Sequence, residues 1–227
     1  MMDDEGGANP LRDDSPSAFD DLIESIGPAS LLVVIESRMG RSLRDRMSSD
    51  DILQEALLHA WRDRARIEWR GLRSFRSYLL SVIDNRIRDL TDHARAEKRG
   101  GGAEPVRVVP IAPPDSSGGD RPGDGALLAS TTPSRIAAYR EERAAMQAAI
   151  EALPAELRDV VRLRLFEQVT LAEIASRLGI GEPAARQRFR KGAAIYRRRL
   201  EVELSSRSES RAGEFGALPR GDSSSLR

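Results

Sequence analysis

The chain has 227 residues, enough for one or two domains, and its formal net charge is zero at pH 7. It contains no cysteine and only two histidines, which excludes a disulfide framework, a thiolate metal site and a cysteine nucleophile. Aromatic residues make up 4% and charged residues 32% of the chain, a balance that favours small helical domains over a β-sandwich. No metal-ligand cluster, Gly-rich phosphate loop or nucleophile with a paired base is visible. We therefore expect no cofactor, no metal and no enzymatic activity.

The charges are distributed unevenly along the chain. Residues 1–28 hold eight acids and one base, whereas residues 62–99 hold eleven bases and six acids. Residues 183–200 hold seven bases and no acid. Two local basic blocks indicate nucleic-acid binding in spite of the neutral total. The N-terminus shows no signal-peptide pattern, and the longest apolar run, 31–35, is too short to span a bilayer. These features predict a cytoplasmic protein without membrane insertion.

Composition divides the chain into two helical units, so the expected fold class is all-α. Residues 100–134 are rich in Gly, Pro, Ser and Asp, which predicts a flexible linker. We expect an N-terminal helical bundle over 17–99 and a C-terminal helix-turn-helix domain over 135–203. Disordered tails are expected at both ends, an acidic one over 1–16 and a second over 204–227.

Four helices are expected in the N-terminal unit. Apolar residues between Phe19 and Ile26 recur at helical spacing and are closed by Gly27-Pro28. A second helix is expected over 31–47, and a third follows a cap at Ser49-Asp50. A long fourth helix is expected to begin at Ser74, after a basic loop that contains a tryptophan.

The C-terminal unit is also expected to be helical. One helix ends near Leu153, and Pro154 suits the first turn of the next helix. Thr170 with Glu173 three residues later has the pattern of a capping box. The short helix that follows is expected to end at Gly179, and the last helix begins near Glu182.

The last two helices have the pattern of a helix-turn-helix. Ala175 supplies a small residue where the helices cross, Gly179 supplies a left-handed turn, and Ala185 and Phe189 can pack inward. The outward residues of the last helix are then Arg186, Gln187, Arg190 and Lys191. Arginine can read guanine through a two-bond major-groove contact, and glutamine can pair with adenine. The alternative is a basic surface on an ordinary helical hairpin.

Three consecutive arginines, Arg197, Arg198 and Arg199, form a separate group. Because they cannot all point one way on a helix, we expect them to be partners of the C-terminal helix dipole and sources of diffuse phosphate attraction. We do not expect them to read bases.

The stretch SDDILQEALLHAW at 49–61 suggests one function for both basic units. It resembles the clamp-binding helix of bacterial sigma factors, in which an Asp-x-x-Gln-Glu core precedes an apolar stripe and a tryptophan. The core residues here are Asp51, Gln54 and Glu55. The stretch SFRSYLLSVIDNRIRD at 74–89 resembles the promoter-melting helix of that family, and 152–200 resembles sigma region 4. A linker where larger sigma factors carry region 3 makes the two-domain extracytoplasmic-function (ECF) type the best match. Gly192 stands where the family usually has alanine.

The resemblance implies an ECF-type sigma factor that binds core RNA polymerase, recognises the −35 and −10 promoter elements and assists promoter melting. Upstream-element contacts are expected from the four outward residues of the last helix. Downstream-element and melting contacts are expected from Trp69, Arg73, Asn85, Arg86 and Arg88. Polymerase contacts are expected from Asp51, Gln54 and Glu55. Promoter DNA and core polymerase are the implied partners, and many relatives are also held by an anti-sigma factor.

Alternatives remain for single residues and for the whole chain. Trp69 suits a core anchor as well as a DNA contact, whereas Trp61, on the apolar stripe, is expected in the core. Asp50 and Asp51 suit N-terminal partners of the helix dipole as well as polymerase contacts. The alternative function is a stand-alone helix-turn-helix transcriptional regulator with a helical N-terminal dimerisation or sensor domain.

Overall fold

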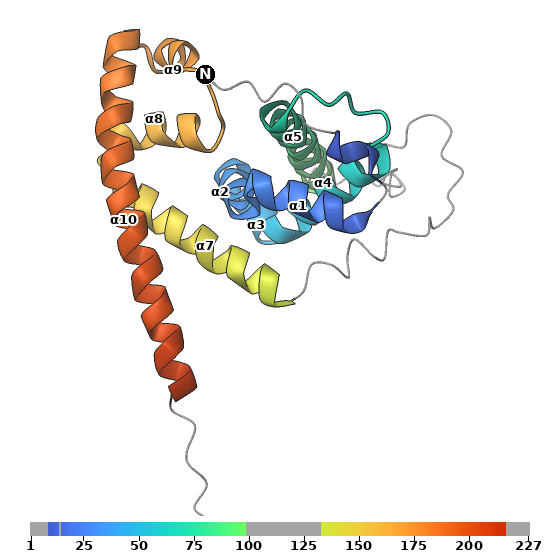
Figure 1. Ribbon diagram of the computed structural model, residues 1–227. Helices are drawn as coiled ribbons and strands as arrows, with labels where there is room; N and C mark the ends of the chain where they lie inside the picture. Colours follow the sequence, from blue (N-terminus) through green and yellow to red (C-terminus); the bar gives the residue numbers. More distant parts are fainter. Residues whose placement is uncertain (1–8, 14, 99–132, 217–227) are drawn as a thin grey trace, which may run out of the picture. The chain divides into compact units, whose positions relative to one another are not determined.

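The computed structural model describes residues 9–13, 15–98 and 133–216, which form helices and contain no strand. This confirms the all-α class for the described residues. Two compact units make up the chain, one over Met1–Ala137 and one over Ala138–Arg227. No helix in the described ranges is long and apolar enough to cross a membrane. The elements in chain order (Figure 1) are a 3-10 turn η1 Pro10–Arg12, α1 Pro16–Ile26, α2 Pro28–Arg38, α3 Arg41–Arg44, α4 Ser49–Asp63, α5 Leu72–Lys98, α7 Pro133–Glu151, α8 Ala155–Leu165, α9 Leu171–Leu178 and α10 Glu182–Gly216.

The chain is already structured before α1, which corrects the expectation of a disordered tail over 1–16. The side-chain Oδ1 of Asn9 accepts a hydrogen bond from the backbone N–H of Leu11 at 2.9 Å and so caps the turn η1. Leu11 is 1% exposed, and η1 packs against α1. A single buried apolar residue next to a local cap is thus enough to fix this turn. Residues 1–8 lie outside the described residues.

Helix α1 follows the apolar pattern of its sequence. Its buried side chains are Phe19, Leu22, Ile23 and Ile26. The helix ends at Gly27, whose φ of 77° lies in the left-handed region that glycine adopts without strain. The backbone N–H of Gly27 bonds to the carbonyl of Glu24, so both the stripe and the end of this helix are confirmed.

The single helix expected over 31–47 is instead two shorter helices. Helix α2 ends at Arg38, Met39 is extended, and α3 begins after Gly40. The break leaves carbonyl groups without helical partners, and the side chain of Arg44 satisfies two of them. It donates to the carbonyl of Met39 at 2.9 Å and to that of Glu36 at 3.0 Å. Apolar spacing alone does not reveal such a side-chain replacement of helical hydrogen bonds.

An aromatic cluster fills the core of the first unit. The ring of Phe19 in α1 meets Trp61 of α4 edge-on at 5.2 Å and Phe75 of α5 at 6.4 Å between ring centroids. Trp61 is 5% exposed, as expected for a core residue. Arg76 of α5 is also buried and donates to the carbonyl of Ile26 at 2.8 Å. Burial lowers the pKa of Arg76 to about 10, so the guanidinium stays charged at neutral pH.

In the second unit, α8, α9 and α10 enclose a smaller core. Val160, Leu163 and Ile174 are buried together, and Phe189 of α10 packs partly against them. At the base of α8, Arg158 donates to the carbonyls of Glu151 and Leu153 at 2.8 and 3.0 Å. These bonds tie the end of α7 to the beginning of α8.

Helix α10 continues to Gly216, beyond the expected boundary at residue 203. The stretch 201–216 contains no proline, and its residues are largely compatible with a helix. The hydroxyls of Ser205 and Ser206 donate to carbonyls four residues earlier, which fits a continuous helix. The expectation of disorder from 204 is corrected as far as residue 216, and residues 217–227 lie outside the described residues. The predicted linker is likewise undescribed over 100–132.

Candidate nucleic-acid and partner interfaces

A capping box fixes the start of α9, and a left-handed glycine fixes its end. The hydroxyl of Thr170 accepts from the backbone N–H of Glu173 at 3.3 Å, and the Glu173 carboxylate accepts from the Thr170 backbone N–H at 3.1 Å. This confirms the capping box. The Thr170 hydroxyl also donates to the Glu173 carboxylate at 2.7 Å, and this bond, together with the one from the Thr170 backbone N–H, lowers the pKa of Glu173. Gly179 ends α9 in the left-handed region, with φ 62° and ψ 33°. Ala175 is 6% exposed, as expected for a small residue buried between helices.

The first turns of α10 separate an apolar side from a basic one. Ala185 is fully buried and Phe189 is half-buried, whereas the four predicted upstream-element residues are exposed. An open surface depression of about 720 Å³ is lined by Glu182, Pro183, Arg186, Gln187, Arg190 and Lys191. The structure thus brings the four predicted residues to one place. Their contacts with DNA stay a prediction.

Glu182 is a member of this depression that the sequence interpretation did not include. Its carboxylate accepts from Arg186 Nη2 at 2.6 Å, four residues later on the same helix. The i, i+4 spacing of an acid and a base was the available signal. Both side chains are about half exposed, and such surface pairs contribute little to stability, so a nucleic acid can displace Glu182 from Arg186.

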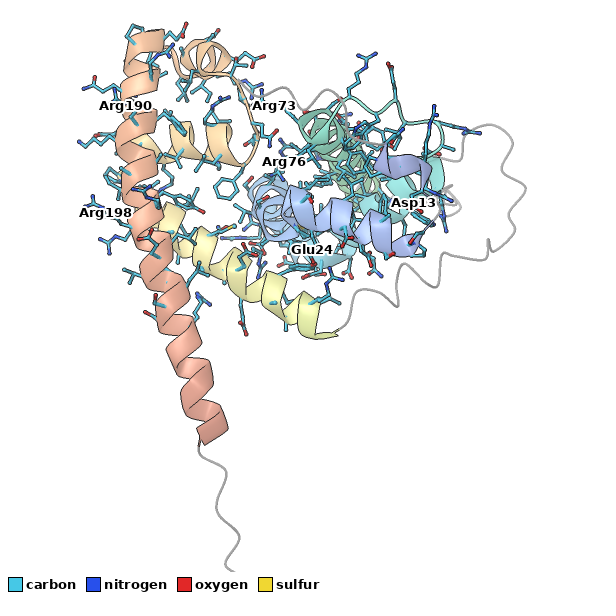
Figure 2. All side chains as sticks on the ribbon, in the orientation of Figure 1. Asp13, Glu24, Arg73, Arg76, Arg190 and Arg198 are labelled. Atoms are coloured by element: carbon cyan, nitrogen blue, oxygen red, sulfur yellow. The ribbon has the colours of Figure 1, made fainter. Side chains whose placement is uncertain are left out.

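The arginine triplet does not lie where the sequence suggested. Arg197, Arg198 and Arg199 are all exposed but lie mid-helix, because α10 continues to Gly216. The interpretation as C-terminal dipole partners is therefore wrong, since that effect is confined to the last turn. Arg190 and Arg198 both project from α10 (Figure 2). Diffuse attraction of phosphate is the role that remains for the triplet.

On α4, a capping box holds Asp51, one of the predicted polymerase contacts. Ser48, one residue before the predicted cap, is the N-cap: its hydroxyl accepts from the backbone N–H of Asp51 at 3.1 Å. The Asp51 carboxylate in turn accepts from the Ser48 backbone N–H at 3.1 Å, which completes a capping box. Asp51 and Gln54 are exposed and Glu55 is half-buried. The carboxylate of Asp51 thus already supports its own helix.

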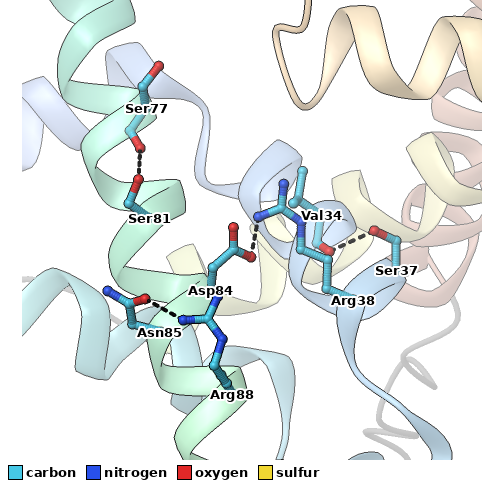
Figure 3. Close-up of polar contacts among 8 residues, drawn as sticks. All are labelled: Val34, Ser37, Arg38, Ser77, Ser81, Asp84, Asn85 and Arg88. Atoms are coloured by element: carbon cyan, nitrogen blue, oxygen red, sulfur yellow. Dashed lines mark hydrogen bonds and ion pairs between the residues drawn. The ribbon is translucent and has the colours of Figure 1, made fainter. Parts of the chain in front are cut away.

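The predicted downstream residues of α5 fall into two groups. Asn85 and Arg88 are exposed neighbours, with Arg88 Nη1 donating to Asn85 Oδ1 at 3.2 Å (Figure 3). Arg86 is paired instead with Glu55 of α4, through two hydrogen bonds. The structure therefore joins one predicted DNA contact to one predicted polymerase contact.

The loop between α4 and α5 and the first turn of α5 supply the remaining predicted residues, Trp69 and Arg73. Trp69 is half-buried with its ring centroid 6.2 Å from that of Phe75, so it belongs partly to the core, as the alternative interpretation expected. Arg73 is exposed (Figure 2). Arg64, which the sequence interpretation passed over, lies 3.9 Å over the Trp61 ring and donates to the Trp61 carbonyl at 2.9 Å. This cation–π contact holds the start of the loop to α4.

Comparison with known protein families finds a match in each of the two units. Residues 30–100 match sigma-70 region 2, and residues 143–194 match sigma-70 region 4. The two matches together cover more than half of the chain and occur in the order that the sequence motifs indicated. The chain belongs to the sigma-70 family.

A curated relative agrees with this membership. The chain is 31% identical over 157 residues to the "Probable RNA polymerase sigma factor RfaY" of Xanthomonas campestris pv. campestris. The alignment covers 69% of this chain and 35% of the relative, so it spans about a third of the relative's length. All predicted polymerase and downstream-element residues lie within the sigma region 2 match. The four predicted upstream-element residues of α10 lie within the region 4 match.

Proposed function

We propose that this protein is an RNA polymerase sigma factor of the ECF type. It binds core polymerase, recognises an upstream and a downstream promoter element and assists opening of the duplex. It works in the cytoplasm and has no catalytic activity of its own. The observation that carries the proposal is the presence of sigma-70 regions 2 and 4 in one chain, each with exposed polar residues suited to its task.

The chemistry of the second unit supports recognition of the upstream element. Guanidinium and amide groups at Arg186, Gln187 and Arg190 can bond base edges in the major groove, and Lys191 can bind phosphate. These side chains start from the N-terminal turns of a helix whose opposite side is anchored by Ala185. A recognition helix is presented to DNA in this way in helix-turn-helix proteins.

The first unit supports polymerase binding and the capture of melted DNA. Asp51 and Glu55 provide negative charge one turn apart on α4, which suits a basic helix of a partner. Around the loop after α4, an exposed cation at Arg73 lies near a half-buried ring at Trp69 in the sequence. Aromatic and arginine side chains of this kind stack bases and track the backbone of single-stranded DNA.

The proposal is tested by reconstitution with bacterial core polymerase. The full chain is mixed with core enzyme, binding is measured by fluorescence anisotropy, and the promoters bound by the holoenzyme are identified by sequencing. Transcription from those promoters is then measured in vitro. We expect a stable complex and sigma-dependent initiation. A reference sigma factor that binds core serves as the positive control. If this protein does not bind core and instead binds a symmetric operator as a dimer, it is the stand-alone regulator.

An anti-sigma factor as a regulatory partner stays a prediction of the family resemblance. It is tested by asking whether a membrane or soluble protein that co-purifies with the chain from its native cell prevents core binding. Release of transcription when that protein is removed is the expected result.

A further inference from the structure

Arg86 and Glu55 form a planar pair that joins α5 to α4. Arg86 Nη2 donates to Glu55 Oε1 at 3.1 Å, and Arg86 Nε donates to Glu55 Oε2. A guanidinium that bonds both oxygens of one carboxylate fixes the orientation of each group. The Arg86 side chain is 25% exposed and that of Glu55 is 41% exposed. The pair therefore lies at the surface, with the carboxylate the more accessible partner.

The pair sets Arg86 apart from the other predicted DNA contacts of α5. Asn85 and Arg88 lie three residues apart, on neighbouring positions of the helix surface, and bond to each other. Arg86 is rotated from Asn85 by one residue, about 100° around the helix, and its side chain meets α4. Because Arg86 is adjacent to Asn85 in the sequence, it was predicted to contact DNA. In the structure its guanidinium bonds to Glu55 of α4 instead.

On α4, Glu55 belongs to the row of residues that we expect to meet polymerase. It lies one turn after Asp51 and next to Gln54. A carboxylate can accept about four hydrogen bonds. The two bonds from Arg86 leave accepting capacity on the exposed edge of Glu55. An oriented and partly exposed carboxylate is well suited to a cationic side chain on a partner.

We propose that Arg86 is a positioning residue for polymerase binding: it holds the Glu55 carboxylate in the orientation that meets a basic side chain of the polymerase, and it does not contact promoter DNA. This inference rests on the proposed sigma function. The physical benefit is that Glu55 loses less side-chain freedom when the partner docks, because Arg86 already restricts it. The two-bond contact with Glu55 also requires arginine, since a lysine ammonium cannot bond both carboxylate oxygens in a plane.

The test compares full-length Arg86→Met and Arg86→Lys with the wild-type protein and with Arg95→Met, a control at another exposed arginine of α5. Binding to core polymerase is measured by anisotropy, and thermal unfolding shows that each variant is folded. We expect both Arg86 variants to weaken core binding roughly 5–10-fold and Arg95→Met to leave it unchanged. Binding of a single-stranded downstream-element oligonucleotide by holoenzyme assembled at saturating concentration should not change for any variant.

A double-mutant cycle distinguishes positioning from a structural role. If Arg86 acts through Glu55, adding Arg86→Met to Glu55→Gln should cause no further loss of core binding. Fully additive losses would overturn the inference, as would unchanged core binding or a loss confined to the oligonucleotide. Failure of the wild-type protein itself to bind core would instead overturn the proposed function, and the inference with it.

Discussion

Gly192 of α10 lies so close to Val161 of α8 that no side chain fits between them. A Cβ atom on Gly192 would lie 2.5 Å from Cγ2 of Val161 and 3.3 Å from Cβ of Leu157. Val161 and Leu157 are both buried in the core of the second unit. A side chain at position 192 would therefore require Val161 to move, because α8 and α10 approach each other closely at this position.

We expect Gly192→Ala to destabilise the protein, although alanine favours a helix over glycine by about 1 kcal/mol. Overpacking of a filled core costs about 1–3 kcal/mol, and the propensity gain offsets about 1 kcal/mol of it, so the net loss of unfolding free energy should be up to about 2 kcal/mol. Urea unfolding measures it. In a Val161→Ala background the clash with Cγ2 is absent, and Gly192→Ala should then be neutral or stabilise the protein by up to about 1 kcal/mol through helix propensity. Equal losses in both backgrounds would show that the close approach is not the cause.

Asp51 completes a capping box and is also a predicted polymerase contact. Two different substitutions are therefore needed to separate these roles. Asp51→Arg removes the capping box and the negative charge together, so weakened core binding in that variant has two explanations. Asp51→Gln removes the charge and lengthens the side chain by one methylene group, but glutamine at N3 can still complete a capping box. We expect Asp51→Gln to unfold at nearly the wild-type temperature while core binding falls. Unchanged core binding in both variants would contradict a polymerase contact at Asp51.

Basic and polar residues along α10 should affect promoter choice in different ways. Arg186→Ala or Gln187→Ala should cost about 1–3 kcal/mol at one base pair of the upstream element if the side chain reads that base. Arg198→Ala should weaken all promoters alike, since it supplies general phosphate attraction. Transcription from a set of single-base promoter variants measures both effects. A uniform loss for Arg186→Ala would assign it to phosphate instead.

Burial should delay the titration of the Tyr196 hydroxyl. Its ring meets Phe166 edge-on at 6.0 Å, and burial, helped by the charge of Glu142, raises its pKa to about 12. Because the folded pKa lies above the unfolded value near 10, the stability that Tyr196 contributes is complete below pH 10 and is lost as pH rises toward 12. Phenolate absorbance measured against pH should include a component near pH 12 that Tyr196→Phe removes.

The same substitution tests the energetics of the buried hydroxyl. The Tyr196 hydroxyl has no hydrogen-bond partner among the described residues, and an unsatisfied buried polar group costs about 1–3 kcal/mol. We therefore expect Tyr196→Phe to be neutral or stabilising at pH 7 in thermal unfolding. A clear loss of stability would indicate that the hydroxyl is satisfied in solution, for instance by water.

Local sequence signals were dependable where neighbouring residues decide the structure. Thr170 and Glu173 predicted a capping box, and Gly179 predicted a left-handed end to α9; both are present. The same reasoning placed the cap of α4 one residue late, because Ser48 and Ser49 are both suitable N-caps and only the bonds to Asp51 distinguish them. The break at Gly40 was missed, since it depends on the Arg44 side chain replacing helical hydrogen bonds.

Local patterns in the sequence were sufficient to predict the all-α class, most helix positions and the basic face of α10, because these depend on residues within about one helical turn of one another. The pairing of Arg86 with Glu55, 31 residues earlier, and the close approach of α8 to Gly192 could be seen only once the helices were packed together. Both follow from how neighbouring helices are rotated and how closely they approach. Packing of the whole core sets those quantities, so no single helix sequence contains them.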